Sequence, residues 1–272
     1  MESEPKMASN PAFSAPEFNR PASLSVDELE RLYRQPAAAA PERADFTPAS
    51  GQMTYNTVIA KTIISFIVLG LAAGVGWLFP VVALPAAIAG FVLGLVNIFK
   101  KQPSPGLVLS YSAVQGLFVG GVSSIFNTMW DGIVAQALFG TTAVVAAVMF
   151  LYSNNMIRTS SRMTKIVLGL MVGYLVFSLV NFGLVLFGAS ESMFGLRGSV
   201  EVFGIPLGVI VGVLAVFLAV YSLMLDFDYI RNGVASRIPE VYSWRAAFGI
   251  TLTVVWLYVE ILRLLAILRG NN

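Results

Sequence analysis

The chain has 272 residues, of which 57% are hydrophobic and 12% are charged, and its mean hydropathy is +0.77. A soluble domain is about half apolar and about a quarter charged, so these values indicate a membrane protein with several spans. The net charge is only +2, and no basic run is interleaved with aromatic residues, which argues against a nucleic-acid partner.

The sequence contains neither cysteine nor histidine. Disulfides, thiolate nucleophiles, iron–sulfur clusters and zinc sites built from these residues are therefore excluded. We expect no cofactor and no structural metal. Histidine is also the usual group that titrates near neutral pH, so a response to pH would have to come from carboxylates.

Residues 1–52 are expected to form a disordered cytoplasmic tail, because they are rich in proline, serine and alanine and cannot build a core. The stretch 25–34 (SVDELERLYR) has capping-box spacing at Ser25 and Glu28, with acids at its start and arginines at its end. It predicts a short helix, either transient or a docking site for a cytoplasmic partner. The tail has no apolar stretch near its start, so no cleavable signal peptide is expected.

The composition changes at residue 53, and residues 53–272 are expected to form one membrane domain. A helix needs about 20 apolar residues to cross a hydrocarbon core of ~30 Å. Seven runs meet this length within a few residues, namely 59–79, 81–99, 106–126, 132–152, 165–187, 203–225 and 245–267. The sequence thus predicts an all-α integral membrane protein with a bundle of seven transmembrane helices.

Basic residues are distributed unevenly between the two sides of the predicted bundle. Three fall on one side, where Arg197 and Arg269 lie in or beside loops and Arg263 lies near the end of the last run. Nine fall on the side that holds the tail, namely Lys61, Lys100, Lys101, Arg158, Arg162, Lys165, Arg231, Arg237 and Arg245. Because short cytoplasmic loops carry the excess of Lys and Arg, we expect a cytoplasmic N-terminus and a C-terminus outside the cell membrane.

Glycines recur four residues apart in several of the apolar runs. The sets are Gly70/Gly74, Gly90/Gly94, Gly116/Gly120, Gly169/Gly173 and Gly204/Gly208/Gly212. In a membrane this spacing lets helix backbones approach closely, so we expect compact packing at these positions. Glycine hinges for gating are the alternative interpretation.

Two carboxylates, Asp226 and Asp228, stand at the end of the sixth apolar run. Ionisable groups in a membrane span are costly and mark functional positions. Side chains two residues apart project about 200° apart on a helix, so we expect one to face the bundle and the other to face water or Arg231. A solvated helix end is the alternative, although carboxylates at a helix C-terminus oppose the macrodipole.

The last apolar run contains a third acid, Glu260, in its outer part. Arg263 follows one turn later, at a spacing that allows an ion pair. Thr253 lies two turns before Glu260 on nearly the same face, with Trp256 between them. This semi-polar stripe either lines a water-filled path or bonds to a neighbouring helix.

Neutral polar residues and tyrosines also occur inside the runs. Gln115 and Asn181 are predicted to form interhelical hydrogen bonds, since an amide in lipid needs a partner. Tyr111, Tyr174 and Tyr221 are expected to be packing or interfacial aromatics.

Several segments together resemble a known family. They are 9–13 (SNPAF), 53–55 (MTY), 61–62 (KT), 111–121 (YSAVQGLFVGG), 225–233 (LDFDYIRNG) and 258–265 (YVEILRLL). Over residues 53–268 the chain resembles the Bax inhibitor-1 family of transmembrane Bax-inhibitor-motif proteins, in its bacterial YccA-like branch and actinobacterial subgroup. The resemblance implies a seven-helix bundle whose last helix is central and is surrounded by the other six.

The resemblance also implies which residues act. Family members are associated with a pH-sensitive calcium leak, in which aspartates of the sixth and seventh spans sense protons. The sixth-span motif reads Asp-Thr-Gln-x-Ile, and here Asp226 takes the position of its aspartate and Asp228 that of its glutamine. The seventh-span aspartate position holds Thr253, and a third-span glutamate common in the family is Gln115. A second carboxylate is then supplied by Asp228 or by Glu260.

The leading prediction is therefore a pH-sensitive cation leak channel of the bacterial inner membrane, gated by carboxylates at the end of the sixth span. Calcium is the expected ion, because carboxylate and carbonyl oxygens suit this hard cation. The alternative, implied by the YccA-like resemblance, is a non-conducting regulator of a membrane-bound AAA protease, with the tail as the contact. The sequence lacks the motifs of metalloproteases and serine hydrolases, so no enzymatic activity is expected.

Overall fold

The computed structural model describes residues 51–189 and 192–270. Backbone contacts divide the chain into one unit that ends at Thr47 and a second from Pro48 to Asn272, and all described residues belong to the second unit. The predicted tail, apart from its last two residues, and the predicted helix at 25–34 lie outside the described residues.

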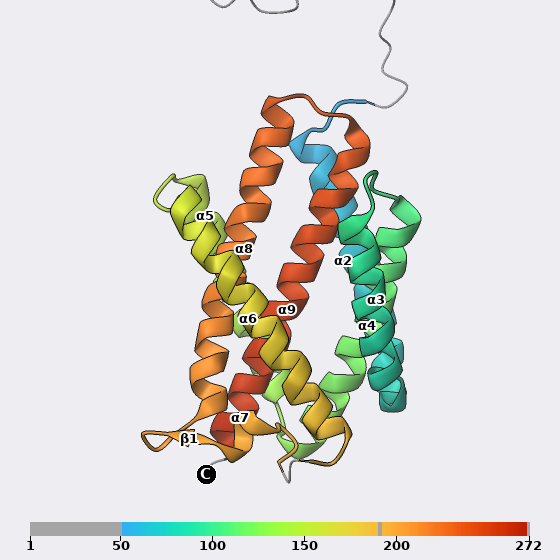
Figure 1. Cartoon of the computed structure of the whole chain (residues 1–272). Coiled ribbons are helices and arrows are strands. Elements are labelled where there is room, and N and C mark those ends of the chain that lie inside the picture. Colours follow the sequence, from blue (N-terminus) through green and yellow to red (C-terminus); the bar gives the residue numbers. More distant parts are fainter. Residues whose placement is uncertain (1–50, 190–191, 271–272) are drawn as a thin grey trace, which may run out of the picture. The chain divides into compact units, whose positions relative to one another are not determined.

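Seven helices of the described chain are long and apolar enough to cross a membrane, as the sequence predicts (Figure 1). These helices are α2 (Tyr55–Leu78), α3 (Ala83–Phe99, after a 3₁₀ turn Pro80–Val82), α4 (Pro105–Met129), α5 (Ile133–Ser153), α6 (Ser161–Leu186), α8 (Leu207–Ala235) and α9 (Ser243–Gly270, after a 3₁₀ turn Glu240–Tyr242). The connection between α6 and α8 holds a short helix α7 (Leu196–Ser199) and the antiparallel strands β1 (Glu201–Val202) and β2 (Ile205–Pro206). The all-α prediction is confirmed, with one small hairpin added.

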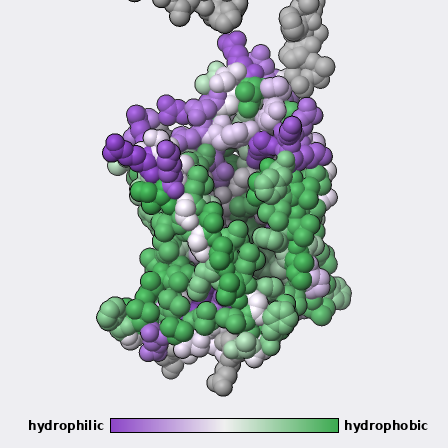
Figure 2. Space-filling view, in the orientation of Figure 1, coloured by the Kyte–Doolittle hydropathy of each residue, from purple (hydrophilic) through white to green (hydrophobic). Residues whose placement is uncertain are grey.

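A broad belt of apolar side chains covers the described helices, and hydrophilic residues gather at one end (Figure 2). Helix α6 shows this clearly, since Val167 is the one buried residue along its length and its other apolar side chains are at least partly exposed. Exposure on this scale is unfavourable in water but fits contact with acyl chains.

Helix α9 is the central helix of the bundle, as the family resemblance implies. It packs against α2, α4, α5 and α8, and Figure 1 shows it between α8 and the group formed by α2, α3 and α4. Its buried residues cover most of the circumference of the helix, and the remaining side, with Leu252, Trp256, Val259 and Arg263, lines a cavity. A polar side chain on α9 therefore has to find its partner within the protein.

The start of the membrane domain is tied to the connection between α8 and α9. The amide of Met53 donates to the carbonyl of Ile238 at 2.8 Å, and its side chain is buried against Val58 and Ile230. Thr54 then caps α2 through a reciprocal capping box with Thr57. This anchoring sets where α2 begins beside α8 and α9.

Helices α2 and α4 approach each other through glycines. A Cβ atom added at Gly76, Gly116 or Gly120 would meet a backbone carbonyl of the opposing helix. The pairs Gly70/Gly74 and Gly169/Gly173 instead have open space where a Cβ would lie. The predicted close packing is thus found at Gly116/Gly120 and not at those two pairs, because the spacing does not reveal which face meets a neighbour.

Helix α8 extends well beyond the predicted run 203–225. It continues to Ala235, so Asp226 and Asp228 lie inside the helix, about two turns or more before its end. The alternative prediction, that these carboxylates stand at a solvated helix end and oppose the helix macrodipole, is therefore wrong. Hydropathy marks only the part of a helix that suits lipid, whereas the backbone hydrogen bonds continue into the polar segment.

Gly120→Leu should destabilise the protein by about 3 kcal/mol or more, because the new side chain would overlap the α2 backbone. Gly173→Leu on α6 is the matched control and should leave stability nearly unchanged, since nothing lies near that Cβ position. Thermal unfolding of both variants in the same detergent checks this. Equal melting temperatures would show that α2 and α4 do not depend on this close approach.

Candidate functional site

Asp226 joins α8 to the central helix. Its Oδ2 atom accepts a hydrogen bond from Thr253 Oγ1 at 2.8 Å. The carboxylate lies against Gly249, one turn before Thr253, where an added Cβ would meet Asp226 Oδ1. The family resemblance aligns Thr253 with the seventh-span aspartate. Thr253 is in direct contact with Asp226, so a hydroxyl stands here in place of that carboxylate.

Asp228 faces a different part of the structure. Its carboxylate accepts from the hydroxyl of Tyr152, at the end of α5, at 2.5 Å, and from the hydroxyl of Thr159 in the α5–α6 connection. In the described part of the chain Asp228 has no ion pair with Arg231. The two aspartates therefore diverge, as the two-residue spacing predicts, and Asp228 fastens the α5–α6 connection to α8.

A second polar group, the Glu260 cluster, surrounds Glu260 with Arg197, Arg263, Tyr174 and Ser178. Glu260 lies seventeen residues after the start of α9, which is about 26 Å along the helix, and is 1% exposed. Its carboxylate accepts from Arg263 at 2.6 Å, from Arg197 at 3.1 Å and from the Tyr174 hydroxyl. Arg197 also donates to Tyr174 at 3.1 Å and to Ser178 at 2.9 Å.

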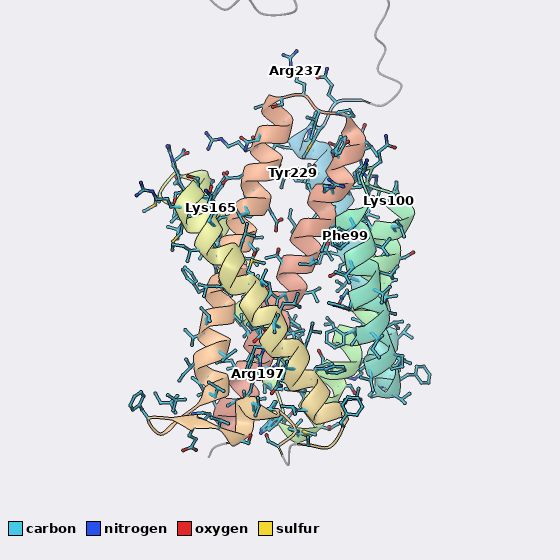
Figure 3. The ribbon with its side chains drawn as sticks, viewed as in Figure 1. Phe99, Lys100, Lys165, Arg197, Tyr229 and Arg237 are labelled. Atoms are coloured by element: carbon cyan, nitrogen blue, oxygen red, sulfur yellow. The ribbon has the colours of Figure 1, made fainter. Side chains whose placement is uncertain are left out.

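Arg197 enters the cluster from the short helix α7. Its side chain is 2% exposed and lies at the opposite end of the bundle from Lys100, Lys165 and Arg237 (Figure 3). The guanidinium carbon is 5.3 Å from the ring centre of Tyr174 and 5.4 Å from that of Phe177. The aromatic faces and the carboxylate together offset the cost of burying this cation.

The segment before α7 is held in place by Asn181 of α6. The Asn181 amide nitrogen donates to the carbonyl of Phe194 at 3.1 Å, and its oxygen accepts from the amide of Leu196 at 2.8 Å. Gly195, between these partners, has φ +63°, a left-handed conformation that suits glycine. Asn181 thus bonds the backbone that leads into α7 rather than another spanning helix, and so positions Arg197.

A cavity of about 500 Å³ adjoins the Glu260 cluster. Its polar lining includes Gln115, Asn181, Arg197, Glu260 and Arg263. Residues that the sequence analysis treated separately, on the third, fifth and last spans, are therefore brought to one place. Asp226 and its partner Thr253 do not line this cavity, and neither does Asp228.

Three members of the cluster, Arg197, Tyr174 and Ser178, could not be recognised as such from the sequence. The prediction that Arg197 is a loop charge is wrong, because its side chain is buried and paired with Glu260. Tyr174 does pack against Trp256, as predicted, but it also donates its hydroxyl to Glu260, which the sequence did not indicate. The available signal was a lone arginine between glycines in a short connection, combined with a lone glutamate deep in the last span that needs a cation. Neither observation identifies its partner without the arrangement of the helices.

The family model described as Bax inhibitor 1 like matches residues 10–270, which is nearly the whole chain. Among curated proteins, none matches the chain.

Glu260→Gln should cost about 3 to 5 kcal/mol of stability, because it leaves two guanidinium groups near a neutral amide within the membrane-spanning region. Glu240→Gln makes the same change in the partly exposed pair with Lys61, where water reaches the carboxylate, and should cost much less, about 1 kcal/mol. The melting temperatures of the two variants in detergent check this. If Glu260→Gln is no less stable than Glu240→Gln, the cluster does not hold the bundle together.

Proposed function

Because the chain belongs to the Bax inhibitor 1 like family, we propose that it is a pH-sensitive cation leak channel without enzymatic activity. Calcium is the proposed ion, and Asp226 is the proposed gate. The observation that carries the proposal is the hydrogen bond between Asp226 and Thr253, since it places an ionisable group between α8 and the central helix. Carboxylates at such positions in a membrane mark ion and proton pathways.

The gate would operate through competition for one oxygen atom. When Asp226 is ionised, its oxygens attract a hard cation, and the cation competes with the Thr253 hydroxyl for Oδ2. Loss of that hydrogen bond removes a polar contact between α8 and α9 and lets the helices separate. When Asp226 is protonated, it no longer attracts the cation, and the contact with α9 persists.

The Glu260 cluster would act as a second barrier on the same helix. Thr253 and Glu260 lie seven residues apart on α9, which is about 10 Å along the helix. Two guanidinium groups and one carboxylate carry a net charge of +1 in their ordinary ionised states, and this charge repels an approaching cation. On this proposal the channel is closed while the cluster is intact, and conduction would require α7 and Arg197 to move.

Calcium flux into proteoliposomes, measured at about pH 6 and about pH 8, tests the gate. Wild-type flux should rise several-fold with pH, because ionised Asp226 attracts the cation. Asp226→Asn should remove this dependence on pH. Asp228→Asn is the matched control and should keep it, since Asp228 contacts the α5–α6 connection instead of α9.

Two results would contradict this assignment. Loss of the pH response in Asp228→Asn alone would move the gate to the other carboxylate. Flux no greater than that of empty liposomes at both pH values would argue against a leak and would favour the alternative function, regulation of a membrane-bound protease.

We also propose that the end of the bundle rich in basic residues faces the cytoplasm, with the C-terminus outside the inner membrane. Lys100, Lys165 and Arg237 lie at this end (Figure 3). Of the three basic residues assigned to the other side, Arg197 and Arg263 belong to the Glu260 cluster inside the bundle. The charge asymmetry of the loops is therefore larger than the sequence suggests, which supports this orientation.

The absence of cysteine makes single-cysteine labelling a direct test of orientation. Phe203→Cys, in the fully exposed β1–β2 turn, should react with an impermeant maleimide added outside spheroplasts. Ser236→Cys, at the exposed end of α8, should react only after lysis. The opposite pattern would reverse the orientation.

A further inference from the structure

A groove of about 890 Å³ lies between α2 and α5, with residues of α8 and α9 forming its floor. Its volume is within the range of about 300–1,000 Å³ that small-molecule sites occupy. Lining residues Ile59 and Ile63 of α2 and Met149 of α5 are more than half exposed. The groove therefore opens on the apolar outer surface of the bundle, where acyl chains would meet it.

The length of the groove corresponds to one leaflet of a bilayer. On α2 its lining extends from Tyr55 to Phe66, which is about 16 Å along the helix. This is roughly half of a ~30 Å hydrocarbon core. The deep end is formed by apolar residues such as Leu223 of α8 and Val254 of α9, together with Thr141 of α5.

The shallow end of the groove is polar and basic. Tyr55, Ser153, Asn155 and Arg231 line it, and Arg231 is exposed. Arg158 donates to Asn155 Oδ1 at 3.4 Å, so a second guanidinium lies beside this end. The neighbouring acid, Asp228, does not line the groove and accepts from the hydroxyls of Tyr152 and Thr159.

A single polar atom interrupts the wall below this end. Thr62 lines the groove. Its Oγ1 atom is buried and has no hydrogen-bond partner, and it is the one such side-chain atom among the described residues. Val58, one turn earlier on α2, packs with Ile230 beside Arg231. Thr62 therefore lies about 6 Å deeper in the membrane than Arg231. In a phospholipid the glycerol esters likewise lie deeper than the phosphate.

We infer that this groove binds one anionic phospholipid, with its phosphate at Arg231, an ester oxygen near the Thr62 hydroxyl, and an acyl chain along the floor. Basic pockets between transmembrane helices on the cytoplasmic side are known to suit anionic head groups. The apolar lining, the lateral opening and the single-leaflet depth fit a lipid better than a soluble anion. The inference does not depend on the leak or on its gate.

Native mass spectrometry of the purified full chain in detergent, with added phosphatidylglycerol or phosphatidylcholine, tests the site. The wild type should retain one lipid and should prefer phosphatidylglycerol. Arg231→Gln should lower retention of phosphatidylglycerol about fivefold, the effect expected of one basic residue near an anionic head group, and should abolish the preference. Arg162→Gln, which changes an exposed arginine at the start of α6 outside the groove, should behave like the wild type.

A second variant tests the apolar part of the groove. Ala146→Trp places a large side chain at an exposed lining position of α5 and should abolish retention of both lipids. A phosphatidylglycerol with a photoreactive acyl chain should crosslink to the lining residues of α2 and α5 in wild-type membranes and not in this variant.

Equal retention of both lipids by the wild type would overturn the inference. So would equal loss in Arg231→Gln and Arg162→Gln, or crosslinks that scatter over the lipid-facing surface of α6. A mass of two chains that Ala146→Trp reduces to one would assign the groove to a second copy instead.

Discussion

The buried carboxylate of Glu260 is the interaction on which the rest of the bundle depends. A charge within the membrane-spanning region is tolerated only when it is paired and fully hydrogen-bonded, and Arg197, Arg263 and Tyr174 meet that requirement. Their contacts bring α6, α7 and α9 to one point. Helix α6 buries little apolar surface of its own, with Val167 its one buried residue, so polar contacts account for much of its attachment at this end.

Helix α9 carries both polar contacts that the proposed function uses. Asp226 of α8 meets it at Thr253, and the Glu260 cluster meets it two turns later. Because lipid offers no hydrogen bonds, each of these contacts is more specific than the apolar packing around it. A change of protonation at Asp226 or a movement of α7 would therefore act on the same central helix. The anionic lipid inferred between α2 and α5 would rest on α8 and α9 beside the first contact.

Much of the fold could be predicted from the sequence, because the membrane sets the length of each span and hydropathy reports it. All seven spans are present, and the central place of α9 agrees with the family resemblance. The boundary of α8 could not be obtained in this way, since Asp226, Asp228 and Arg231 continue a helix that has left the most apolar region. Which glycines allow close helix packing could not be predicted either, because their spacing shows that they share a face of a helix but not which element packs against that face.

The sequence by itself determined that this is a seven-span membrane protein without cysteine or histidine, and that only a few acids lie inside its apolar runs. Only the tertiary structure decided that Asp226, and not Asp228, contacts α9. It also decided that the side chain of Arg197, from α7, is buried and pairs with Glu260. The physical reason is that composition and periodicity are local, whereas Arg197 and Glu260 are brought together by how α6, α7 and α9 pack. A buried charge reveals that it needs a partner, but the packing of the helices selects which one.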